Sequence, residues 1–463
     1  MKTYDIIIIG SGGGSKLRPA ADLGKKVAII EKDYLGGTCL NRGCIPSKML
    51  IHTADVAEEI REAGKFNIVG DLNFKVDFNP LTNRVSQSVG DTSRGIADYY
   101  AKEENVDYFH GEARFVENKV IEVNGEKLTA ETIVIGVGTR PAIPPIEGLE
   151  GTPYLTSTEA IHNHDQQPKK MIVVGAGYIA TELGYFYGAT GTDVHFLVRS
   201  RMLKNEDSEV AAEFTRAFSE RFNVHMGVSP TKVAHKDGIF TVHTKDKEGN
   251  ESTMEADALF IATGITPNSD TLDLQNTDIE TNEKGYIKVD DKLQTKVPGV
   301  YALGDVVGNY LFRHSVNFEG EYLLEALFTN PNDKPIDYPP MPHAVFTRPQ
   351  IAGVGKTEDQ LKEEGLEADK DYIIGLNSYQ KSAMGGDALQ SDYGFCKLLF
   401  DKQSKKLLGA HIIGYEASTL IHQFIYAITF GGTLDDLLHM IYIHPALPEI
   451  CRNACRNARS KLD

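Results

Sequence analysis

The sequence predicts an α/β protein made of two Rossmann-like units and a C-terminal α+β domain. A short apolar run that leads into a glycine-rich turn occurs twice, at residues 6–14 and again at residues 171–177. Such runs are typical of strands buried on both faces of a parallel sheet. Beyond about residue 338, strand-like and helix-like stretches follow one another without a turn of this kind.

Length and composition limit the class of protein. At about 150 residues per domain, the 463 residues predict three domains, and the net charge of −17 argues against a nucleic-acid-binding surface. No apolar run reaches the roughly 18 residues of a membrane span, and Tyr4 and Asp5 lead directly into the first strand, so we expect no membrane segment and no signal peptide. Five cysteines are too few for a secreted disulfide scaffold, so we expect a cytoplasmic protein.

The first unit has the parts of a dinucleotide-binding site. Its turn contains Gly10, Gly12 and Gly14, and the next strand-like run, at residues 26–30, ends at Glu31. Glycines in such a turn let a pyrophosphate approach the N-terminus of the following helix, and an acid after the second strand accepts from a ribose hydroxyl. We therefore predict that a dinucleotide binds here.

The second unit repeats this order with one chemical difference. Gly175 and Gly177 form its turn, but the strand-like run at residues 193–198 is followed by Arg199 and Arg201 instead of an acid. A guanidinium at this position suits a ribose 2′-phosphate, to which it donates charge-assisted hydrogen bonds. The second site is therefore predicted to prefer NADPH to NADH.

Two dinucleotide-binding units in one chain imply electron transfer between two cofactors. Strand-like runs at residues 133–136 and 259–264 each end in a glycine-containing turn before a proline, and the run at 299–305 places Asp305 just beyond a strand. The chain is thus expected to leave the first domain near residue 147 and to return near residue 265. The expected domains are residues 1–147 with 265–337, residues 148–264, and residues 338–463.

The C-terminal domain has its own pattern. Strand-like segments alternate between residues 393 and 413 around a polar turn at residues 401–405. Helical stretches are predicted near residues 357–364 and 417–430. No nucleotide-binding turn occurs in this part, which indicates an α+β domain with another role.

Cys39 and Cys44 are two of only five cysteines, yet they lie five positions apart within residues 36–48. In a reducing compartment such a pair is more often catalytic or metal-binding than a structural crosslink. Pro46 suits the first turn of a helix, where the helix dipole favours a thiolate. Lys48, four residues after Cys44, is expected on the same face of that helix.

Several motifs together resemble one known family. They are the cysteine motif at residues 36–48, the second glycine-rich turn, and the segments 302–305, 346–349 and 444–449. The chain resembles the flavoprotein disulfide reductases, a group that contains glutathione reductase, dihydrolipoyl dehydrogenase, mercuric reductase and mycothione reductase. The resemblance covers essentially the whole chain. It implies FAD in the first unit, a pyridine nucleotide in the second, and dimerisation through the C-terminal domain.

The resemblance also implies the roles of individual residues. Cys39 would attack the substrate disulfide and Cys44 would exchange electrons with the flavin, while Lys48 would pair with Glu182 near the reactive edge of the flavin. Tyr178 would cover the nicotinamide pocket. Further cofactor contacts are expected, by position alone, at Gly37, Thr38, Ile179, Gly264, Asp305 and His314.

His444 is the expected acid–base group, and Glu449 would orient its imidazole. In the family this histidine reaches the disulfide of the partner subunit, so a homodimer with shared active sites is implied. The substrate is expected to be a small-molecule disulfide. His195, in a predicted core strand, is interpreted as structural.

The first turn departs from the usual family pattern. Ser15 stands where a third glycine is common, and Pro19 falls inside the predicted helix, where a proline costs about 3 kcal/mol. The helix must therefore be short, be kinked or start late. A short first unit, the arginine at 199 and the ending at residues 444–449 resemble the mycothione reductase branch.

Three alternatives stay open at this point. Dihydrolipoyl dehydrogenases use NAD and usually carry an acid where Arg199 stands. Mercuric reductases need a vicinal cysteine pair near the tail, but Cys451 and Cys455 are interpreted as packing or surface residues, and Cys396 as a core thiol. A zinc protein with Cys39, Cys44 and His444 as ligands would leave both nucleotide units unexplained, so no metal is expected.

Overall fold

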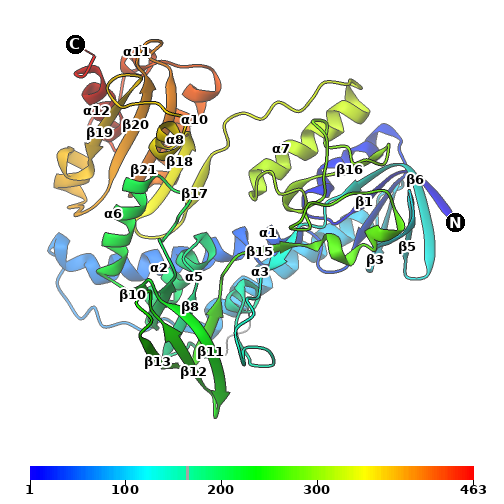
Figure 1. Ribbon diagram of the computed structural model, residues 1–463, viewed down its shortest axis with the longest axis horizontal. Coiled ribbons are helices and arrows are strands. Elements are labelled where there is room, and N and C mark those ends of the chain that lie inside the picture. The colour runs from blue at the N-terminus through cyan, green and yellow to red at the C-terminus, as the bar shows by residue number, and fades with distance from the viewer. Residues whose placement is uncertain (163–165, 463) are drawn as a thin grey trace.

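The computed structural model describes residues 1–162 and 166–462. Figure 1 shows three regions: a sheet near the N-terminus, a second sheet from the middle of the chain, and a third from its C-terminal part. Helices α2 (Cys44–Glu62) and α3 (Phe78–Tyr100) extend from the first region towards the second. The three regions meet beside α2, where the cysteine motif lies.

The first region is a seven-stranded sheet in the order β3-β2-β1-β6-β5-β4, with β16 paired to β6. Its parallel part joins β3, β2, β1, β6 and β16, as the buried apolar runs predict. Ile6 and Ile8 face one core and Ile7 and Ile9 the other, so both faces of β1 are covered. The strands are β1 (Lys2–Ile9), β2 (Val27–Glu31), β3 (Val106–His110), β4 (Arg114–Glu117), β5 (Val120–Val123), β6 (Glu126–Ile135) and β16 (Val300–Ala302).

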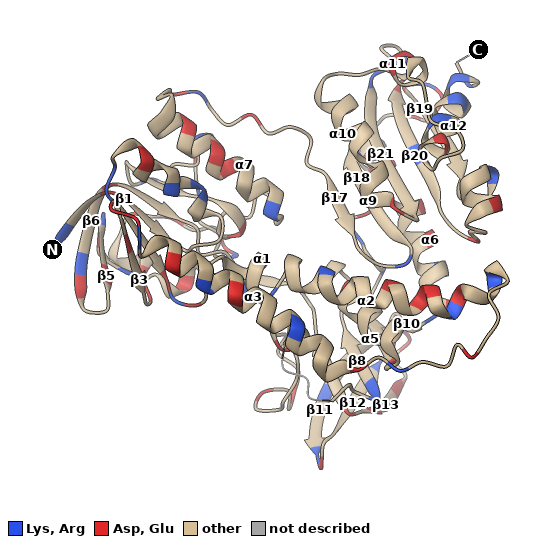
Figure 2. Cartoon of the chain, turned by 180° about the vertical axis from the view of Figure 1, so that it is seen from behind, with Lys and Arg blue, Asp and Glu red and all other residues tan. Residues whose placement is uncertain are grey.

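The connection from β1 to β2 is a 3-10 helix, η1 (Gly14–Leu23), with Pro19 inside it. Leu17 and Ala20 pack on β1 and β2, and Gly24 ends the helix with a φ of 78°. The sequence predicts a short, kinked or late-starting helix around Pro19. The structure shows a short helix, and it is of the 3-10 type. Helix α7 (Arg313–Leu324) packs against η1 over the same face. Acidic and basic residues alternate with uncharged ones along α3 and α7, as the coloured ribbon of Figure 2 shows.

The second region contains the four-stranded parallel sheet β10-β9-β8-β14 and the antiparallel sheet β11-β12-β13. Helix α5 (Tyr178–Thr190) connects β8 to β9 and packs against α2 of the first region. Helices α4 (Ser157–Ile161) and α6 (Ser208–Ser219) complete it. The strands are β8 (Lys170–Val174), β9 (Asp193–Val198), β10 (Asn223–Met226), β11 (Ser229–Lys236), β12 (Ile239–Lys245), β13 (Glu251–Ala256) and β14 (Ala258–Ile261).

Two short antiparallel strands, β7 (Thr139–Pro141) and β15 (Ile265–Pro267), form the crossing between the first and second regions. They lie close to the points where the sequence predicts that the chain leaves and re-enters the first domain. We therefore propose that residues 148–264 form a domain inserted between residues 1–147 and 265–337.

The third region is the antiparallel sheet β17-β18-β21-β20-β19. The predicted turn at residues 401–405 lies between β20 and β21, and Thr357 caps the predicted helix α8. The elements are β17 (His343–Val345), β18 (Gln350–Gly355), β19 (Tyr372–Ser378), β20 (Phe395–Asp401), β21 (Leu407–Gly414), α8 (Glu358–Glu363), α9 (Ala417–Leu420), α10 (His422–Thr429), α11 (Leu434–His439) and α12 (Pro448–Arg459).

These three regions confirm the predicted fold class, with two α/β units and a C-terminal α+β region. Within the described residues, no helix is both long enough and apolar enough to cross a bilayer. We propose residues 338–463 as the extent of the third domain, because the strand order changes completely beyond that point.

Candidate active site

A cavity of about 1550 Å³ lies where the three regions meet. Its walls come from the first turn, the cysteine motif, the start of α5, the start of α7 and strand β17. Most of the residues selected from the sequence line it: Gly10, Gly12, Glu31, Gly37, Thr38, Cys39, Cys44, Lys48, Tyr178, Ile179, Glu182, Asp305 and His314. The cavity therefore brings together residues that are separated by up to about 300 positions in the chain.

Helix α1 (Gly37–Asn41) carries Cys39, and Cys44 is the first residue of α2. Gly43 joins the helices; a Cβ atom there would lie 3.0 Å from the Thr38 carbonyl oxygen. The two thiols are reduced, and the Cys39 thiol donates to the Cys44 sulfur. This tight connection places the two sulfur atoms side by side.

The two thiols have opposite acid–base properties. The hydrogen bond from Cys39 lowers the pKa of Cys44 to about 7; burial opposes this effect, and the Lys48 ammonium supports it. The same hydrogen bond and burial raise the pKa of Cys39. Of the two thiols, Cys44 is therefore the one that ionises near neutral pH, whereas Cys39 stays protonated and needs a base to become a nucleophile.

Lys48 and Glu182 form the ion pair that the resemblance implies. Lys48 Nζ lies 2.6 Å from Glu182 Oε2, although the residues belong to α2 and α5. Glu182 also accepts from the Phe346 backbone N–H at 2.9 Å, and the Lys48 ammonium lies 4.5 Å from the centre of the Phe346 ring. Three regions thus hold one charge pair against the cavity wall.

The glycines of the first turn allow neighbouring backbone segments to approach one another closely. Gly10 has a φ of 94°, and a Cβ atom there would lie 2.4 Å from the Gly136 carbonyl oxygen. A Cβ atom at Gly37 would lie 2.6 Å from the Cα atom of Gly12. Any side chain at these positions would therefore displace the cavity wall.

Two glycines of this turn differ from the expectation. Gly14 does not line the cavity. A Cβ atom added at Gly14 would lie 2.6 Å from the Ile8 side chain, so packing against β1 explains why this position holds glycine. Gly13, which was not predicted from the sequence, does line the cavity. A Cβ atom added there would lie 2.1 Å from the Val316 side chain and overlap it. The sequence signal was the run of three consecutive glycines.

The carboxylates expected to bind a cofactor both reach the cavity. Glu31 accepts from the backbone N–H and the hydroxyl of Ser11, at 2.9 and 2.8 Å. Asp305 accepts from Thr139 at 3.1 Å, and burial raises its pKa. The glycine cradle between these acceptors suits a pyrophosphate flanked by hydroxyl-bearing groups, so the chemistry of FAD fits this end of the cavity.

The second glycine-rich turn also brings backbone segments close together, but its glycines do not line the cavity. Gly175 has a φ of 138°, and its Cβ atom would lie 2.2 Å from the Ala262 carbonyl oxygen. Gly177 is the N-cap of α5 and provides no capping side chain, so the first N–H groups of α5 remain available to an anion. Gly264, beyond β14, has a φ of 137°, which favours glycine.

The two arginines after β9 are not equivalent. Arg199 is exposed at the end of the strand. The Arg201 guanidinium donates to the carbonyl oxygens of Lys204 and Glu206, at 2.5 and 3.1 Å. Arg201 therefore supports its own loop, and Arg199 is the better placed of the two for a phosphate.

Aromatic rings form one side of the cavity. The Tyr178 ring stacks with Phe312 at 6.2 Å and with His343 at 6.4 Å, and Phe312 stacks with His314 at 5.1 Å. Burial lowers the pKa of His314, whose Nε2 lies 2.8 Å from the Pro342 carbonyl oxygen. Sequence reasoning missed Phe312 and His343, because neither belongs to a recognisable local motif.

His444 and Glu449 interact with each other but not with the cysteines of their own chain. His444 Nδ1 lies 3.0 Å from both carboxylate oxygens of Glu449, and the hydrogen bond with His444 lowers the pKa of that carboxyl. The carboxylate is buried and also pairs with Arg452 at 2.8 Å. The His444 side chain, by contrast, is 72% exposed and does not line the cavity.

The remaining cysteines and His195 have packing roles. Cys396, Cys451 and Cys455 are completely buried in the core of the third region, so of the two roles considered for Cys451 and Cys455, packing or surface, the structure shows packing. Within the described residues, no group of histidine, cysteine and acidic side chains could hold a metal ion. His195 lies on β9, where its Nδ1 is 3.0 Å from the Nε2 of His225.

A reduced cysteine pair beside a dinucleotide-shaped cavity defines a class of redox enzyme that passes electron pairs between a cofactor and a disulfide. Two family models match the chain. The model described as pyridine nucleotide-disulphide oxidoreductase covers residues 4–320, and the model of the dimerisation domain covers residues 341–455. The chain belongs to the pyridine nucleotide-disulphide oxidoreductase family, as the resemblance predicts.

Curated relatives agree with this family. A mycothione reductase of Mycobacterium tuberculosis is 34% identical over 99% of this chain and 100% of its own length. A dihydrolipoyl dehydrogenase of Corynebacterium glutamicum is 33% identical over 97% of each chain. A mercuric reductase of Staphylococcus aureus is 34% identical over 94% of this chain and 78% of its own length. The protein is therefore an enzyme that uses FAD and a pyridine nucleotide, and its family is homodimeric.

Proposed function

We propose that this enzyme passes electrons from NADPH, through FAD and the Cys39–Cys44 pair, to the disulfide of a low-molecular-weight thiol. The observation that carries the proposal is the pair itself, with a low-pKa Cys44 beside the Lys48–Glu182 ion pair in a cavity that suits FAD. When bound, FAD supplies a two-electron carrier between the nucleotide and the cysteines.

The cysteines would perform two consecutive exchanges. A Cys39 thiolate attacks one sulfur of the substrate, which releases the first thiol and leaves a mixed disulfide on Cys39. The Cys44 thiolate then attacks Cys39, releases the second thiol, and leaves the Cys39–Cys44 disulfide. The substrate has gained two electrons from the cysteine pair. One of its two protons comes from the Cys39 thiol, and the other comes from solvent because Cys44 reacts as a thiolate.

Because Cys39 has a raised pKa, this scheme needs a base, and His444 fits that role. Its exposure, and the fact that it does not line the cavity of its own chain, support a role in the active site of the partner subunit. Strongly exposed apolar side chains lie near it in the chain: Tyr426, Phe430, Ile441 and Ile443 are 70%, 73%, 99% and 78% exposed. A subunit interface would cover such a surface.

The choice of NADPH depends on the end of β9. Arg199 is exposed there, with no acid in the position that would accept from an unphosphorylated ribose. Tyr178, at the start of α5, would cover the nicotinamide pocket that opens beside Glu182.

Dihydrolipoyl dehydrogenase is the second candidate, because a relative of that name is almost as similar as the mycothione reductase. Such an activity would use NAD and run towards disulfide formation. Mercury reduction is less well supported, because the buried Cys451 and Cys455 cannot serve as an exposed tail pair.

A substrate panel tests the proposal. NADPH and NADH oxidation should be measured with mycothione-like disulfides, glutathione disulfide, bis-γ-glutamylcystine, coenzyme A disulfide, lipoamide and Hg(II). We expect NADPH-linked turnover with a small-thiol disulfide. Efficient NAD-linked oxidation of dihydrolipoamide, with none of the small-thiol disulfides reduced, would replace the proposal with the second candidate.

Cys44→Ser tests the role of the pair directly. This variant should bind FAD and show a normal flavin spectrum, but it should not reduce a disulfide, because the mixed disulfide on Cys39 has no thiolate to resolve it. Cys455→Ala is a control that removes a buried thiol outside the site and should retain turnover. Near-wild-type turnover of Cys44→Ser would contradict the proposed mechanism.

A further inference from the structure

Glu206 is a buried carboxylate that the proposed reaction does not use. It is 3% exposed and lies in the loop between β9 and α6, outside the cavity wall. Two side chains of the cavity wall nevertheless donate to it: the Tyr178 hydroxyl bonds to Oε1, and His343 Nε2 lies 2.8 Å from Oε2. The carboxylate thus holds two of the aromatic rings that line the cavity.

These contacts join all three regions of the molecule. Tyr178 is the first residue of α5, His343 is the first residue of β17, and Phe312 immediately precedes α7. The Tyr178 ring stacks on both neighbouring rings, with an interplanar angle of 25° to His343 and 26° to Phe312. The hydroxyl and the ring of Tyr178 are therefore held at the same time.

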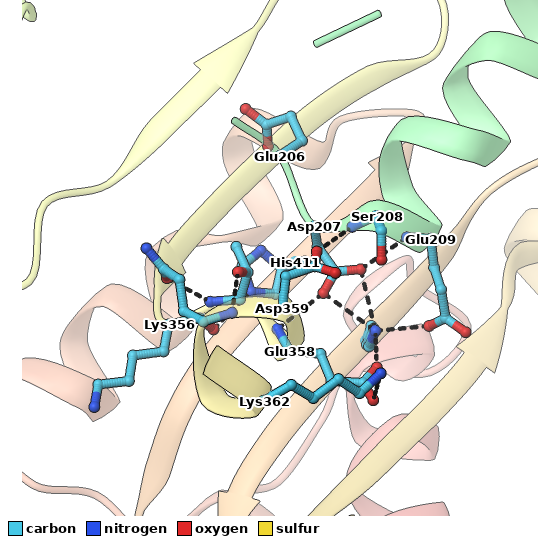
Figure 3. Close-up of polar contacts among 12 residues, drawn as sticks. Glu206, Asp207, Ser208, Glu209, Lys356, Glu358, Asp359, Lys362 and His411 are labelled. Atoms are coloured by element: carbon cyan, nitrogen blue, oxygen red, sulfur yellow. Dashed lines mark hydrogen bonds and ion pairs between the residues drawn. The ribbon is translucent and has the colours of Figure 1, made fainter. Parts of the chain in front are cut away.

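The backbone beside Glu206 is fixed to the third region. Asp207 caps α6 and accepts from Lys397 Nζ at 3.1 Å and from the Glu358 backbone N–H at 3.1 Å. Lys397 is completely buried and also bonds to Glu358 at 2.6 Å. Figure 3 shows this network of Asp207, Glu209 and Glu358, with the Glu206 side chain apart from it and not joined to it by a dashed line. Because its neighbour Asp207 is anchored and its own Oε2 bonds to His343, we expect the Glu206 carboxylate to stay in place if the Tyr178 ring moves.

The ionised state of Glu206 strengthens its hydrogen bond with Tyr178. Burial alone would raise the pKa of Glu206, but the hydrogen bonds from His343 and Tyr178 outweigh it and lower the pKa. Burial and the neighbouring carboxylate raise the pKa of Tyr178, which remains a hydrogen-bond donor. His411, also near Glu206, has its pKa lowered by burial. Tyr178 therefore donates to an ionised carboxylate, and such bonds are stronger than neutral ones.

We propose that Glu206 is a positioning residue that latches Tyr178 in its nucleotide-free position. The inference rests on the proposed function, in which Tyr178 covers the nicotinamide pocket. An incoming nicotinamide displaces the ring, so binding breaks the hydrogen bond to Glu206. The latch thereby weakens nucleotide binding and keeps the pocket covered between turnovers.

Tyr178→Phe removes only the hydroxyl and keeps the ring. Titration of the oxidised holoenzyme with NADP⁺, followed by the flavin absorbance, should give a Kd about ten- to a hundredfold lower than in the wild type, from the usual strength of a hydrogen bond to a charged group. Tyr185→Phe is the matched control: it lies on the same helix and donates to the Asp55 carboxylate at 2.7 Å, but does not line the cavity. Its Kd should equal that of the wild type.

Glu206→Gln tests the acceptor independently. It should tighten NADP⁺ binding by a smaller factor, and the double variant with Tyr178→Phe should bind no tighter than Tyr178→Phe alone, because both changes remove one contact. A merely structural role for Glu206 predicts the opposite sign, with weaker binding in both variants.

An unchanged or higher Kd in Tyr178→Phe, or additive effects in the double variant, would overturn the latch. The same titrations with NAD⁺ separate this result from the cofactor assignment. A wild-type preference for NAD⁺ would contradict the proposed use of NADPH, while the ratio between Tyr178→Phe and the wild type would still decide the latch.

Discussion

Cys39 and Cys44 differ in acidity although they have the same side chain and lie in the same turn. Cys44 accepts the hydrogen bond and lies near Lys48, whereas Cys39 donates it and is partly buried. The asymmetry separates their chemical roles before any substrate binds. One sulfur is ready to hold a negative charge, and the other depends on an external base.

Alkylation of the reduced enzyme should reveal this asymmetry. A thiolate reacts and a thiol does not, so carboxamidomethylation of Cys44 by iodoacetamide should rise with pH around a midpoint near 7, while Cys39 reacts only at higher pH. Peptide mass spectrometry measures each site.

Lys48→Met should move the Cys44 midpoint upwards, because the ammonium favours the thiolate. Lys65→Met, in the 3-10 helix η2 (Ala63–Phe66) that follows the far end of α2, is the control and should leave the midpoint unchanged. Equal midpoints for the two cysteines near the ordinary thiol value would contradict the assignment.

Arg199 is the residue on which the proposed preference for NADPH depends. Arg199→Glu should reverse the preference from NADPH to NADH, because a carboxylate repels the 2′-phosphate and accepts from a free 2′-hydroxyl. Losing one charge-assisted hydrogen bond should lower kcat/KM for NADPH by about ten- to a hundredfold. The measurement is kcat/KM for both nucleotides.

Lys204→Glu, on the same exposed loop, changes the net charge equally and should leave the nucleotide preference intact. A preference for NADH in the wild type, or an unchanged ratio in Arg199→Glu, would contradict the NADPH assignment and favour the dihydrolipoyl dehydrogenase alternative.

At the scale of elements, one lysine joins a helix of the second region to a sheet of the third. Lys397 on β20 is completely buried and pairs with Asp207 at the start of α6 and with Glu358 at the start of α8. Breaking a buried pair is strongly destabilising because it leaves charges without partners.

Lys397→Met should therefore destabilise the enzyme by about 3–5 kcal/mol, measured as a lower Tm. Lys405→Met removes an exposed pair with Asp435 and should cost at most about 1 kcal/mol. An equal Tm for both variants would show that the buried network contributes nothing.

The pKa values of the Lys397 partners also predict how the Tm difference between the wild type and Lys397→Met changes with pH. The pKa values of Asp207 and Glu358 are lowered in the folded enzyme, so their stabilisation is present above their unfolded pKa of about 4 and is lost as the pH falls through the lower folded values. The Tm difference between wild type and Lys397→Met should therefore be constant near neutral pH and shrink below about pH 4.

For the whole molecule, we propose that one chain does not contain a complete site, and the position of His444 supports this proposal. The imidazole is oriented by Glu449 and exposed, while the cysteines of the same chain lie in a cavity that it does not line. Mixing Cys39→Ser with His444→Ala subunits should restore part of the activity, because some heterodimers contain one intact site.

Subunit exchange must be proven independently, for example by mass spectrometry of differently tagged chains. The two parent variants, each incubated alone, are the controls and should stay inactive. If exchange occurs and no activity returns, His444 acts within its own chain or not at all.

The sequence by itself determined the strands and the turns, and it supplied the residues that we propose to be chemically reactive. These features follow from the local properties of the residues. An apolar run such as residues 6–9 has to be buried, and Gly10 adopts a φ of 94° that residues with a side chain avoid. The cysteine motif and the pairing of Lys48 with Glu182 could likewise be expected, the latter through the family resemblance.

Only the tertiary structure decided which distant residues share a contact. Tyr178 and Glu206 are 28 positions apart, and His343 is 137 positions from Glu206, so no local pattern connects them. The burial of Cys451 and Cys455, and the 3-10 form of the helix around Pro19, depend in the same way on what packs against them. Burial and charge pairing are properties of the assembled regions, because they arise only when separate segments exclude water together.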